Sequence, residues 1–153
     1  MSVVVEVDDL SGPDVAELLA AHLASMHATS PPGSVHALDL SGLRAPEVTV
    51  WTARTDGELA GCGALKELSP YAGEVKSMRT AAAHLRRGVA AALLERIVAT
   101  ARERGYAELL LETGHGPDFE AAHGLYLRHG FEACGPFADY TDDEFSRYFR
   151  LAL

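Results

Sequence analysis

The sequence contains few of the features that mark secreted, membrane-spanning or disulfide-bonded proteins. Its 153 residues include two cysteines, Cys62 and Cys134, which lie far apart and form no C-x-x-C motif. Each lies within an apolar segment expected to form a strand. We therefore expect both in the core and neither in a disulfide framework. No apolar run reaches the roughly 20 residues that span a bilayer. The N-terminus lacks the basic and apolar regions of a signal peptide, so a soluble cytoplasmic protein without membrane contacts is expected.

Two common catalytic arrangements are missing as well. The seven histidines show no H-x-x-x-H spacing, which argues against a metal site. No G-x-S-x-G segment is present, so an acyl-enzyme formed on a serine has no support. If the protein is an enzyme, its chemistry is expected to proceed directly between bound substrates.

Acidic residues outnumber basic ones, and most of the excess lies in the first half. The formal net charge is −9, with ten acidic and three basic residues up to position 70, and twelve acidic and ten basic residues after it. Nucleic-acid binding needs a basic face and is not expected. Two explanations stay open. The charge is a solvated, solubilising surface, or the acidic half attracts a cationic acceptor while the more basic half meets an anionic cofactor.

The chain has the composition and length of one globular domain, residues 1–153. Apolar periodicity and turn residues predict the order β-α-α-β-β-β-α-β-α-β-β, an α+β domain with one central sheet. Gly61 and Gly63, inside the third expected strand, indicate close approach of other groups or a bulge. Ser34 is the expected N-cap of the second helix. The expected strands are 3–7, 47–54, 58–68, 73–80, 109–111, 131–134 and 147–153, and the expected helices are 15–28, 35–40, 88–104 and 118–129.

A strand-to-helix loop, Leu85–Ala90, has the properties of an anion-binding site. A helix N-terminus presents unpaired backbone N–H groups and a partial positive charge. Gly88 and Ala90 leave room for an anion to approach that backbone, and the guanidinium groups of Arg86 and Arg87 suit phosphate oxygens. The loop therefore predicts a diphosphate site. The alternative is a basic loop with a glycine at the start of a helix.

The element order, this loop and the segment 125–131 (LYLRHGF) together resemble the GNAT superfamily of acetyltransferases. The resemblance covers nearly the whole chain and is tightest over 74–131. The expected strand 73–80 contains KSMR at 76–79, and the expected strand 109–111 leads into ETG at 112–114. Both segments resemble those of a bacterial subgroup of that family. The resemblance implies a three-layer fold with a mixed, mostly antiparallel sheet flanked by about four helices. It also implies acetyl transfer from acetyl-CoA.

The resemblance assigns cofactor contacts to the strand before the loop and to the loop itself. Met78 and Thr80 would pair with the pantetheine arm like an added strand, and strand pairing is expected to be lost near Met78. The loop departs from the family pattern at Leu85, where Arg or Gln is usual, and Arg86 is expected to replace that contact. The expected cofactor-binding residues are Met78, Arg79, Thr80, Leu85, Arg86, Arg87, Gly88, Val89, Ala90, Ala91 and Tyr126.

Acyl transfer to an amine needs an oxyanion donor, an acid for the leaving thiolate and a route for the amine's proton. The backbone N–H of Met78 is the expected oxyanion donor. Tyr126, with an ordinary pKa of ~10, is the expected acid, the alternative being a core aromatic residue. Glu74 and Glu112 are the expected bases, with two histidines or water as alternatives. The candidate bases and acceptor-binding residues are His36, Glu74, Glu112, His115 and Tyr140.

The sequence thus predicts an N-acetyltransferase that moves acetyl from acetyl-CoA to a primary amine of a small molecule, by direct transfer in a ternary complex and without a metal. Two alternatives stay open: an acyl-CoA-binding sensor without turnover, and a protein N-acetyltransferase. Acceptor selectivity is expected from residues 34–44, 68–73 and 137–144, because loops vary while the scaffold stays. A free sheet edge among the C-terminal strands would allow a homodimer.

Overall fold

The computed structural model describes residues 2–35 and 37–153, and within them it confirms the expected order of strands and helices. The strands are β1 (Val4–Val7), β2 (Val48–Thr55), β3 (Glu58–Ser69), β4 (Ala72–Thr80), β5 (Glu108–Thr113), β6 (Glu132–Cys134) and β7 (Arg147–Ala152). The helices are α1 (Pro13–Thr29), α2 (Leu40–Leu43), α3 (Val89–Glu103) and α4 (Glu120–Arg128).

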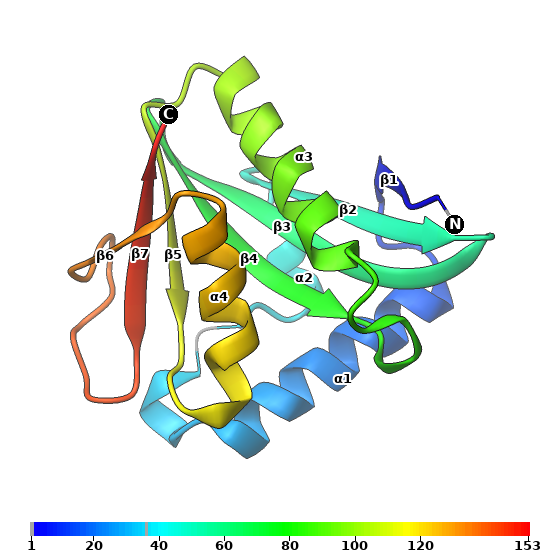
Figure 1. The fold of residues 1–153 in the computed structure, drawn as a ribbon, viewed down its shortest axis with the longest axis horizontal. Coiled ribbons are helices and arrows are strands. Elements are labelled where there is room, and N and C mark those ends of the chain that lie inside the picture. Colours follow the sequence, from blue (N-terminus) through cyan, green and yellow to red (C-terminus); the bar gives the residue numbers. More distant parts are fainter. Residues whose placement is uncertain (1, 36) are drawn as a thin grey trace.

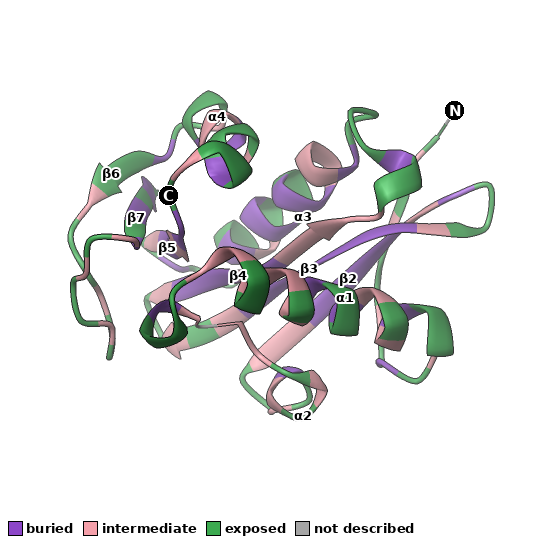
Figure 2. Ribbon diagram, turned by 90° about the horizontal axis from the view of Figure 1, so that it is seen from below, coloured by how far each residue is buried: buried purple, intermediate pink, exposed green. Residues whose placement is uncertain are grey.

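All of these strands form one sheet in the order β1-β2-β3-β4-β5-β7-β6. The β4–β5 pair is parallel and the other pairs are antiparallel, so the expected mixed, mostly antiparallel sheet is confirmed. Helices α3 and α4 cover one face and α1 and α2 the other, which gives three layers (Figures 1 and 2). The short strand β6 lies at one edge, where a free edge among the C-terminal strands was expected.

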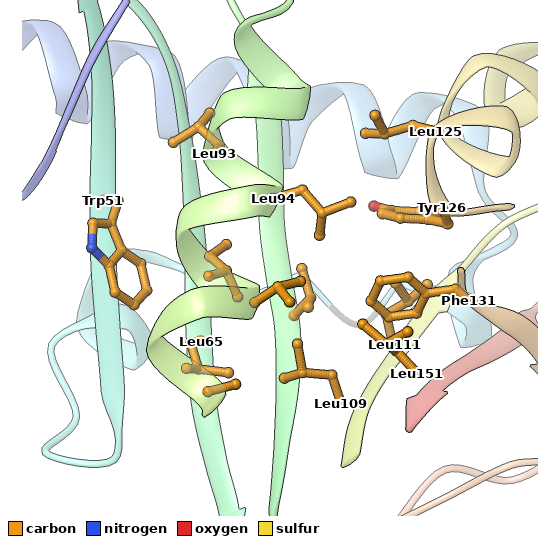
Figure 3. Close-up of a cluster of buried hydrophobic side chains, with 14 of the residues drawn as sticks. Trp51, Leu65, Leu93, Leu94, Leu109, Leu111, Leu125, Tyr126, Phe131 and Leu151 are labelled. Atoms are coloured by element: carbon orange, nitrogen blue, oxygen red, sulfur yellow. The ribbon is translucent and has the colours of Figure 1, made fainter. Parts of the chain in front are cut away.

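Each face of the sheet carries its own apolar core, because the strands alternate side chains between the two faces. On the α3 face, the helix contributes a continuous stripe from Val89 through Leu94 to Ala101, all buried. Tyr126 and Phe131 join this larger cluster (Figure 3). A smaller cluster beneath α1 includes the free thiol of Cys62. Cys134 is partly exposed on β6, so its expected place in the core was wrong: an edge strand of three residues buries little.

Strand β4 carries an irregularity that matters for the site. Its pairing with β3 passes from Ala64↔Lys76 to Cys62↔Arg79, so β4 has one extra residue there. This β-bulge contains Ser77, whose φ of 55° is left-handed. Gly63 lies opposite, where a Cβ would stand 2.6 Å from the sulfur of Met78. The close approach expected from the glycine pattern is confirmed, and the bulge given as its alternative is found opposite, on β4.

The segment between α1 and β2 differs from the expected helix over 35–40. A 3-10 turn forms at Pro32–Ser34, and α2 begins only at Leu40 with Asp39 as its N-cap. The Asp39 carboxylate accepts the N–H of Gly42 at 2.8 Å, which is why the helix begins there and not at Ser34. The Ser34 hydroxyl instead donates to Asp143, 109 residues later in the chain, at 2.9 Å.

The helix expected over 118–129 is shorter in the structure, because its first turn, Pro117–Phe119, is 3-10 and α4 proper begins at Glu120. The remaining boundaries agree with the expected ones to within a few residues. In the described part of the chain, no helix has both the length and the apolar character needed to cross a membrane.

Candidate active site

The site begins where the two parallel strands at the centre of the sheet separate. Pairing between β4 and β5 ends at Val75↔Leu111, and the strands then diverge (Figure 1). Beyond this point β4 still pairs with β3 as far as Thr80. In the described residues its other edge has no strand beside it, so its backbone is free to pair with an extended ligand. The expected loss of pairing near Met78 is confirmed.

The backbone between β4 and α3 contains a left-handed turn that follows the end of this free edge. Arg86 and Gly88 both adopt left-handed φ values, 62° and 80°. Gly88 is the N-cap of α3 and has no side chain that could cap the helix. The first backbone hydrogen bond of the helix is donated by the Ala92 N–H to the Gly88 carbonyl. The first N–H groups of α3 therefore have no partner within the helix. Turns that present successive backbone N–H groups are a common way for proteins to bind anions. A non-glycine residue held at positive φ is typical of functional sites.

The side chains around this turn are exposed. Leu85 is 56% exposed, and Arg86 and Arg87 also reach solvent. The structure thus brings the expected cofactor-binding residues 85–91 to the N-terminus of α3, close to the end of the free β4 edge. Leu85 offers no polar group there, so charge at the turn comes from the two arginines.

Tyr126 lies on α4, on the face of the sheet that also carries α3. Its ring packs against Phe131 and Phe149, with centroid distances of 5.7 and 6.2 Å. Its hydroxyl is on the side that faces Leu94 of α3 (Figure 3). Burial, with a smaller contribution from the Glu112 carboxylate, raises the pKa of Tyr126 to about 12. Tyr126 is therefore a core aromatic residue, which was the alternative to its role as the acid. It is fully protonated at neutral pH.

Three side chains on the opposite face of the sheet form a hydrogen-bonded cluster, in which Tyr140 is half-buried. Lys76 Nζ lies 3.1 Å from Glu74 Oε2 and 2.9 Å from the Tyr140 hydroxyl, which itself donates to Glu74 Oε2. The Lys76 ammonium also stands 5.6 Å from the centre of the Tyr140 ring. The side chains of Glu74 and Lys76 are 3% and 8% exposed. The Glu74 carboxylate is thus neutralised by a lysine and bound by a phenol, as buried charges require.

Glu112 lies near this cluster but is not part of it. It comes near the end of β5, where it pairs with Tyr148 of β7. Burial raises the pKa of Glu112 to about 7, and the negative charges of Glu74 and Asp143 add to this, while a hydrogen bond with Ser146 and the charge of Lys76 oppose it. At neutral pH the Glu112 carboxyl group therefore exists in both protonation states.

The structure brings together three of the expected acceptor-site residues, Glu74, Glu112 and Tyr140. His115 is exposed and its Nδ1 bonds to the Phe145 carbonyl at 2.9 Å, so it is held by the loop before β7. His36 lies outside the described residues. Among the described residues, no group of three or more His, Cys, Asp or Glu could hold a metal ion.

Sequence reasoning did not single out Lys76 or Ser146, and it included Asp143 only as part of the expected acceptor segment 137–144. Lys76 could have been found, because it follows Glu74 by two residues in a strand and so shares its face. Ser146 and Asp143 carry only a weak local signal, since an Asp three residues before a Ser at a strand start is common in turns. Their link to Glu112 depends on the β5–β7 pairing.

The comparisons with known proteins agree with this geometry. Residues 15–131 match the model of the acetyltransferase (GNAT) family. The chain belongs to the GNAT family of acetyltransferases. It is 54% identical to the uncharacterized N-acetyltransferase YsnE of Bacillus subtilis, over 91% of this chain and 92% of that protein. It is 50% identical to the uncharacterized N-acetyltransferase YedL of Escherichia coli, over 97% of this chain and 94% of that protein. This GNAT protein is therefore an acyltransferase.

Solved structures of the GNAT fold superpose on the whole chain. A protein of Klebsiella pneumoniae assigned to the acyl-CoA N-acyltransferases has a TM-score of 0.82 and 30% identity, over 99% of this chain and 97% of that one. An acetyltransferase of Bacillus subtilis solved in complex with CoA has a TM-score of 0.74 and 16% identity, over 99% of both chains. At 16% identity, the similarity to the Bacillus subtilis acetyltransferase shows a shared fold and nothing further.

Proposed function

We propose that this GNAT protein transfers an acetyl group from acetyl-CoA directly to a primary amine of a small molecule, within a ternary complex. One observation carries the proposal. A carboxyl group with a pKa near neutrality, Glu112, and a protonated phenol, Tyr126, lie on opposite faces of the sheet at the point where β4 and β5 separate. An acyl group held in that gap would have a base on one side and an acid on the other.

The backbone around the gap suits coenzyme A. The left-handed turn and the free N–H groups at the start of α3 suit its pyrophosphate, with Arg86 and Arg87 adding positive charge. The free edge from Met78 to Thr80 suits the amide groups of its pantetheine arm. Support comes from the CoA complex of the Bacillus subtilis acetyltransferase, which shares the fold. The bound cosubstrate supplies an acetyl thioester, and the rest of the chemistry is assigned to residues of this chain.

Glu112 is the better candidate for the base. A general base works best when its pKa lies near the working pH, and Glu112 meets this condition. The Glu74 carboxylate is already hydrogen-bonded to Lys76 and Tyr140, which leaves it less accessible to an acceptor amine. We assign Glu112 to accept the proton of the acceptor amine, and we assign Glu74 with its two partners to shape the acceptor side.

Tyr126 acts as a hydrogen-bond donor to the departing sulfur. With its pKa near 12, complete proton transfer to a thiolate of pKa ~8.5 would be uphill by about 5 kcal/mol. Donation of a hydrogen bond carries no such penalty and still stabilises the developing negative charge. The backbone N–H of Met78, beside the bulge, is assigned to the oxyanion.

The test is a thiol-release assay with acetyl-CoA and a panel of primary amines, with mass spectrometry of the amine. Release of free CoA that depends on the amine, with a gain of one acetyl group on it, is the expected result. Acetylation of a peptide N-terminus or lysine but of no small amine would favour a protein N-acetyltransferase. Binding of acetyl-CoA without any transfer would favour a sensor. Either outcome overturns the proposal.

A further inference from the structure

The turn assigned to the CoA pyrophosphate is a short exposed segment between two buried side chains. Residues 85–88 are all exposed, whereas His84 before them and Val89 after them are buried. In the described part of the chain, no side-chain hydrogen bond or ion pair joins residues 85–88 to the rest of the protein. The left-handed conformation of Arg86 and Gly88 therefore depends on how the two ends of the segment are held.

The two ends are held by different chemistry. Val89 is the first residue of α3 and belongs to its apolar stripe, so the packing of the core fixes it. His84 ends a 3-10 turn, Ala82–His84, that follows β4. Its ring is buried, and Nε2 lies 3.0 Å from Glu58 Oε1. The other ring nitrogen, Nδ1, is also buried and has no partner among the described residues, so the contact with Glu58 alone orients the ring.

Glu58 is the first residue of β3, the strand that pairs with the end of β4. The pairing continues one step beyond β4, where the Ala81 N–H donates to the Ala60 carbonyl at 2.8 Å. A carboxylate accepts hydrogen bonds and does not donate them, so His84 Nε2 is the donor to Glu58. The Glu58 side chain is 70% exposed. A surface carboxylate thus orients a buried ring that lies two residues before the left-handed Arg86.

We propose, on the basis of the function proposed above, that His84 and Glu58 together are positioning residues for the turn that binds the CoA pyrophosphate. Their hydrogen bond holds the ring, and the buried ring holds the backbone at the start of residues 85–88. The turn is thereby kept in the shape that presents its N–H groups to an anion. Neither residue is assigned a contact with CoA. Without the bond, the turn has more conformations to lose when CoA binds, which lowers the affinity.

Calorimetric titration with CoA tests this inference, because positioning and simple electrostatics predict opposite effects of Glu58→Ala. The substitution removes the hydrogen-bond acceptor of the His84 ring, and since Glu58 is at the surface it leaves no cavity in the core. Positioning predicts that the Kd for CoA rises by about three- to tenfold. Electrostatics alone predicts a lower Kd, because a negative charge near the binding site of a polyanion is lost.

Glu58→Gln is the matched variant, since its side-chain oxygen can still accept from His84 Nε2 although the charge is gone. It should bind CoA at least as tightly as the wild type. The control is Glu95→Ala, which removes a carboxylate of α3 that lies 3.7 Å from another histidine, His129, at the end of α4. It should leave the Kd for CoA unchanged. Circular dichroism establishes that each variant is folded before it is titrated.

A Kd for CoA in Glu58→Ala that is equal to or below the wild-type value overturns the inference. A Glu58→Gln variant that binds as weakly as Glu58→Ala also overturns it, because the retained hydrogen bond should rescue binding. The readout does not depend on turnover. If the expected order of affinities is found but no amine is acetylated, the inference stands and the proposed function fails. If the wild-type protein does not bind CoA, the inference falls together with the cofactor assignment.

Discussion

The two sides of the gap between β4 and β5 are built from different parts of the chain. The proposed cofactor side consists mainly of backbone: the free edge of β4, a left-handed turn at Arg86 and Gly88, and the first N–H groups of α3. The proposed acceptor side consists of side chains: the Glu74–Lys76–Tyr140 cluster and Glu112. The first is specified by one continuous stretch of sequence. The second is assembled from strands and loops more than 60 residues apart.

This difference explains why the two sides should respond differently to substitution. A site made of backbone tolerates most side-chain changes and is sensitive to φ, so glycine positions decide its shape. A site made of buried charged groups depends on each partner, because removing one leaves another uncompensated. Cofactor binding and acceptor chemistry should therefore be separable by mutation.

The largest effect is expected from Glu112→Gln. If Glu112 is the general base, kcat/KM for the amine should fall by about 10²- to 10⁴-fold, while the affinity for acetyl-CoA, measured by thermal shift, should stay the same. Glu108→Gln is the control, since it lies on the same strand and its carboxylate pairs with Arg150 at the surface. A Glu112→Gln enzyme with activity within threefold of the wild type would mean that another group or water takes the proton.

The second prediction concerns the role of Glu74 as a structural partner. Lys76→Met leaves the Glu74 carboxylate buried and unpaired, so the free energy of unfolding at pH 7 should drop by about 3–5 kcal/mol. Combining it with Glu74→Leu should recover most of that loss, because no charge is then buried. Urea denaturation of the single and double variants measures both values. A double variant no more stable than the single one would contradict this role.

Tyr126→Phe tests the proposed hydrogen-bond donor to the departing sulfur, with little change in packing. The ring contacts with Phe131 and Phe149 remain, and only the hydroxyl group is lost. We expect kcat to fall by about 10- to 100-fold, with thermal stability within about 1 kcal/mol of wild type. An unchanged kcat would leave Tyr126 with the core role alone.

The order of the helices and strands, the bulge opposite Gly63 and the free β4 edge were all predictable from the sequence. The element order and the bulge depend on local periodicity and on glycines that leave room for a neighbour, and both signals are contained in short segments. The free β4 edge was implied by the resemblance to the GNAT superfamily. The turn at Leu85–Ala90 was predictable for the same reason, since a helix start with a glycine is a local feature.

The acceptor side was only partly predictable. Glu74, Glu112 and Tyr140 were expected there, but their roles were not separable, because both glutamates are simply acidic residues in strands. What separates them is the partner that each meets: Lys76 neutralises Glu74, while burial leaves Glu112 with a pKa near 7. Those partners depend on sheet register and on the segment before β7. The misplaced second helix has the same origin, since Ser34 bonds to Asp143 instead of capping a helix.

A smaller effect is expected from glycine substitutions at the two ends of α3. Gly88 and Gly105 both have φ of 80°, and a Cβ on either would meet nothing within 4 Å. Gly88→Ala and Gly105→Ala should therefore cost similar stability, about 1–2 kcal/mol each. Only Gly88→Ala should also weaken CoA binding, by about tenfold, because a free turn that relaxes away from positive φ must be forced back to it when CoA binds. Equal CoA affinities in the two variants would contradict a role for the turn at Gly88 in CoA binding.

The smallest expected effect is on the pH dependence of stability. The pKa of Glu112 is raised to about 7 in the folded protein from 4.5, so the folded state binds more protons than the unfolded state between these values, and this group's contribution to stability falls as the pH rises through them. Glu112→Gln should therefore be more stable than wild type at pH 8, by about 1–2 kcal/mol after allowance for its partial exposure. The advantage should vanish below about pH 5. Thermal unfolding across this range checks it, and a variant less stable at pH 8 would contradict the assignment.

The most direct test of the account is thermal unfolding of the wild-type protein with acetyl-CoA, with CoA, with ATP and without ligand. At a hundredfold excess over Kd, binding adds about 2.7 kcal/mol, or roughly 5–10 °C for a chain of this size. The account predicts such a rise with both CoA forms and a clearly smaller one with ATP, which lacks the pantetheine arm for the β4 edge. No rise with either CoA form, or an equal rise with ATP, would contradict it.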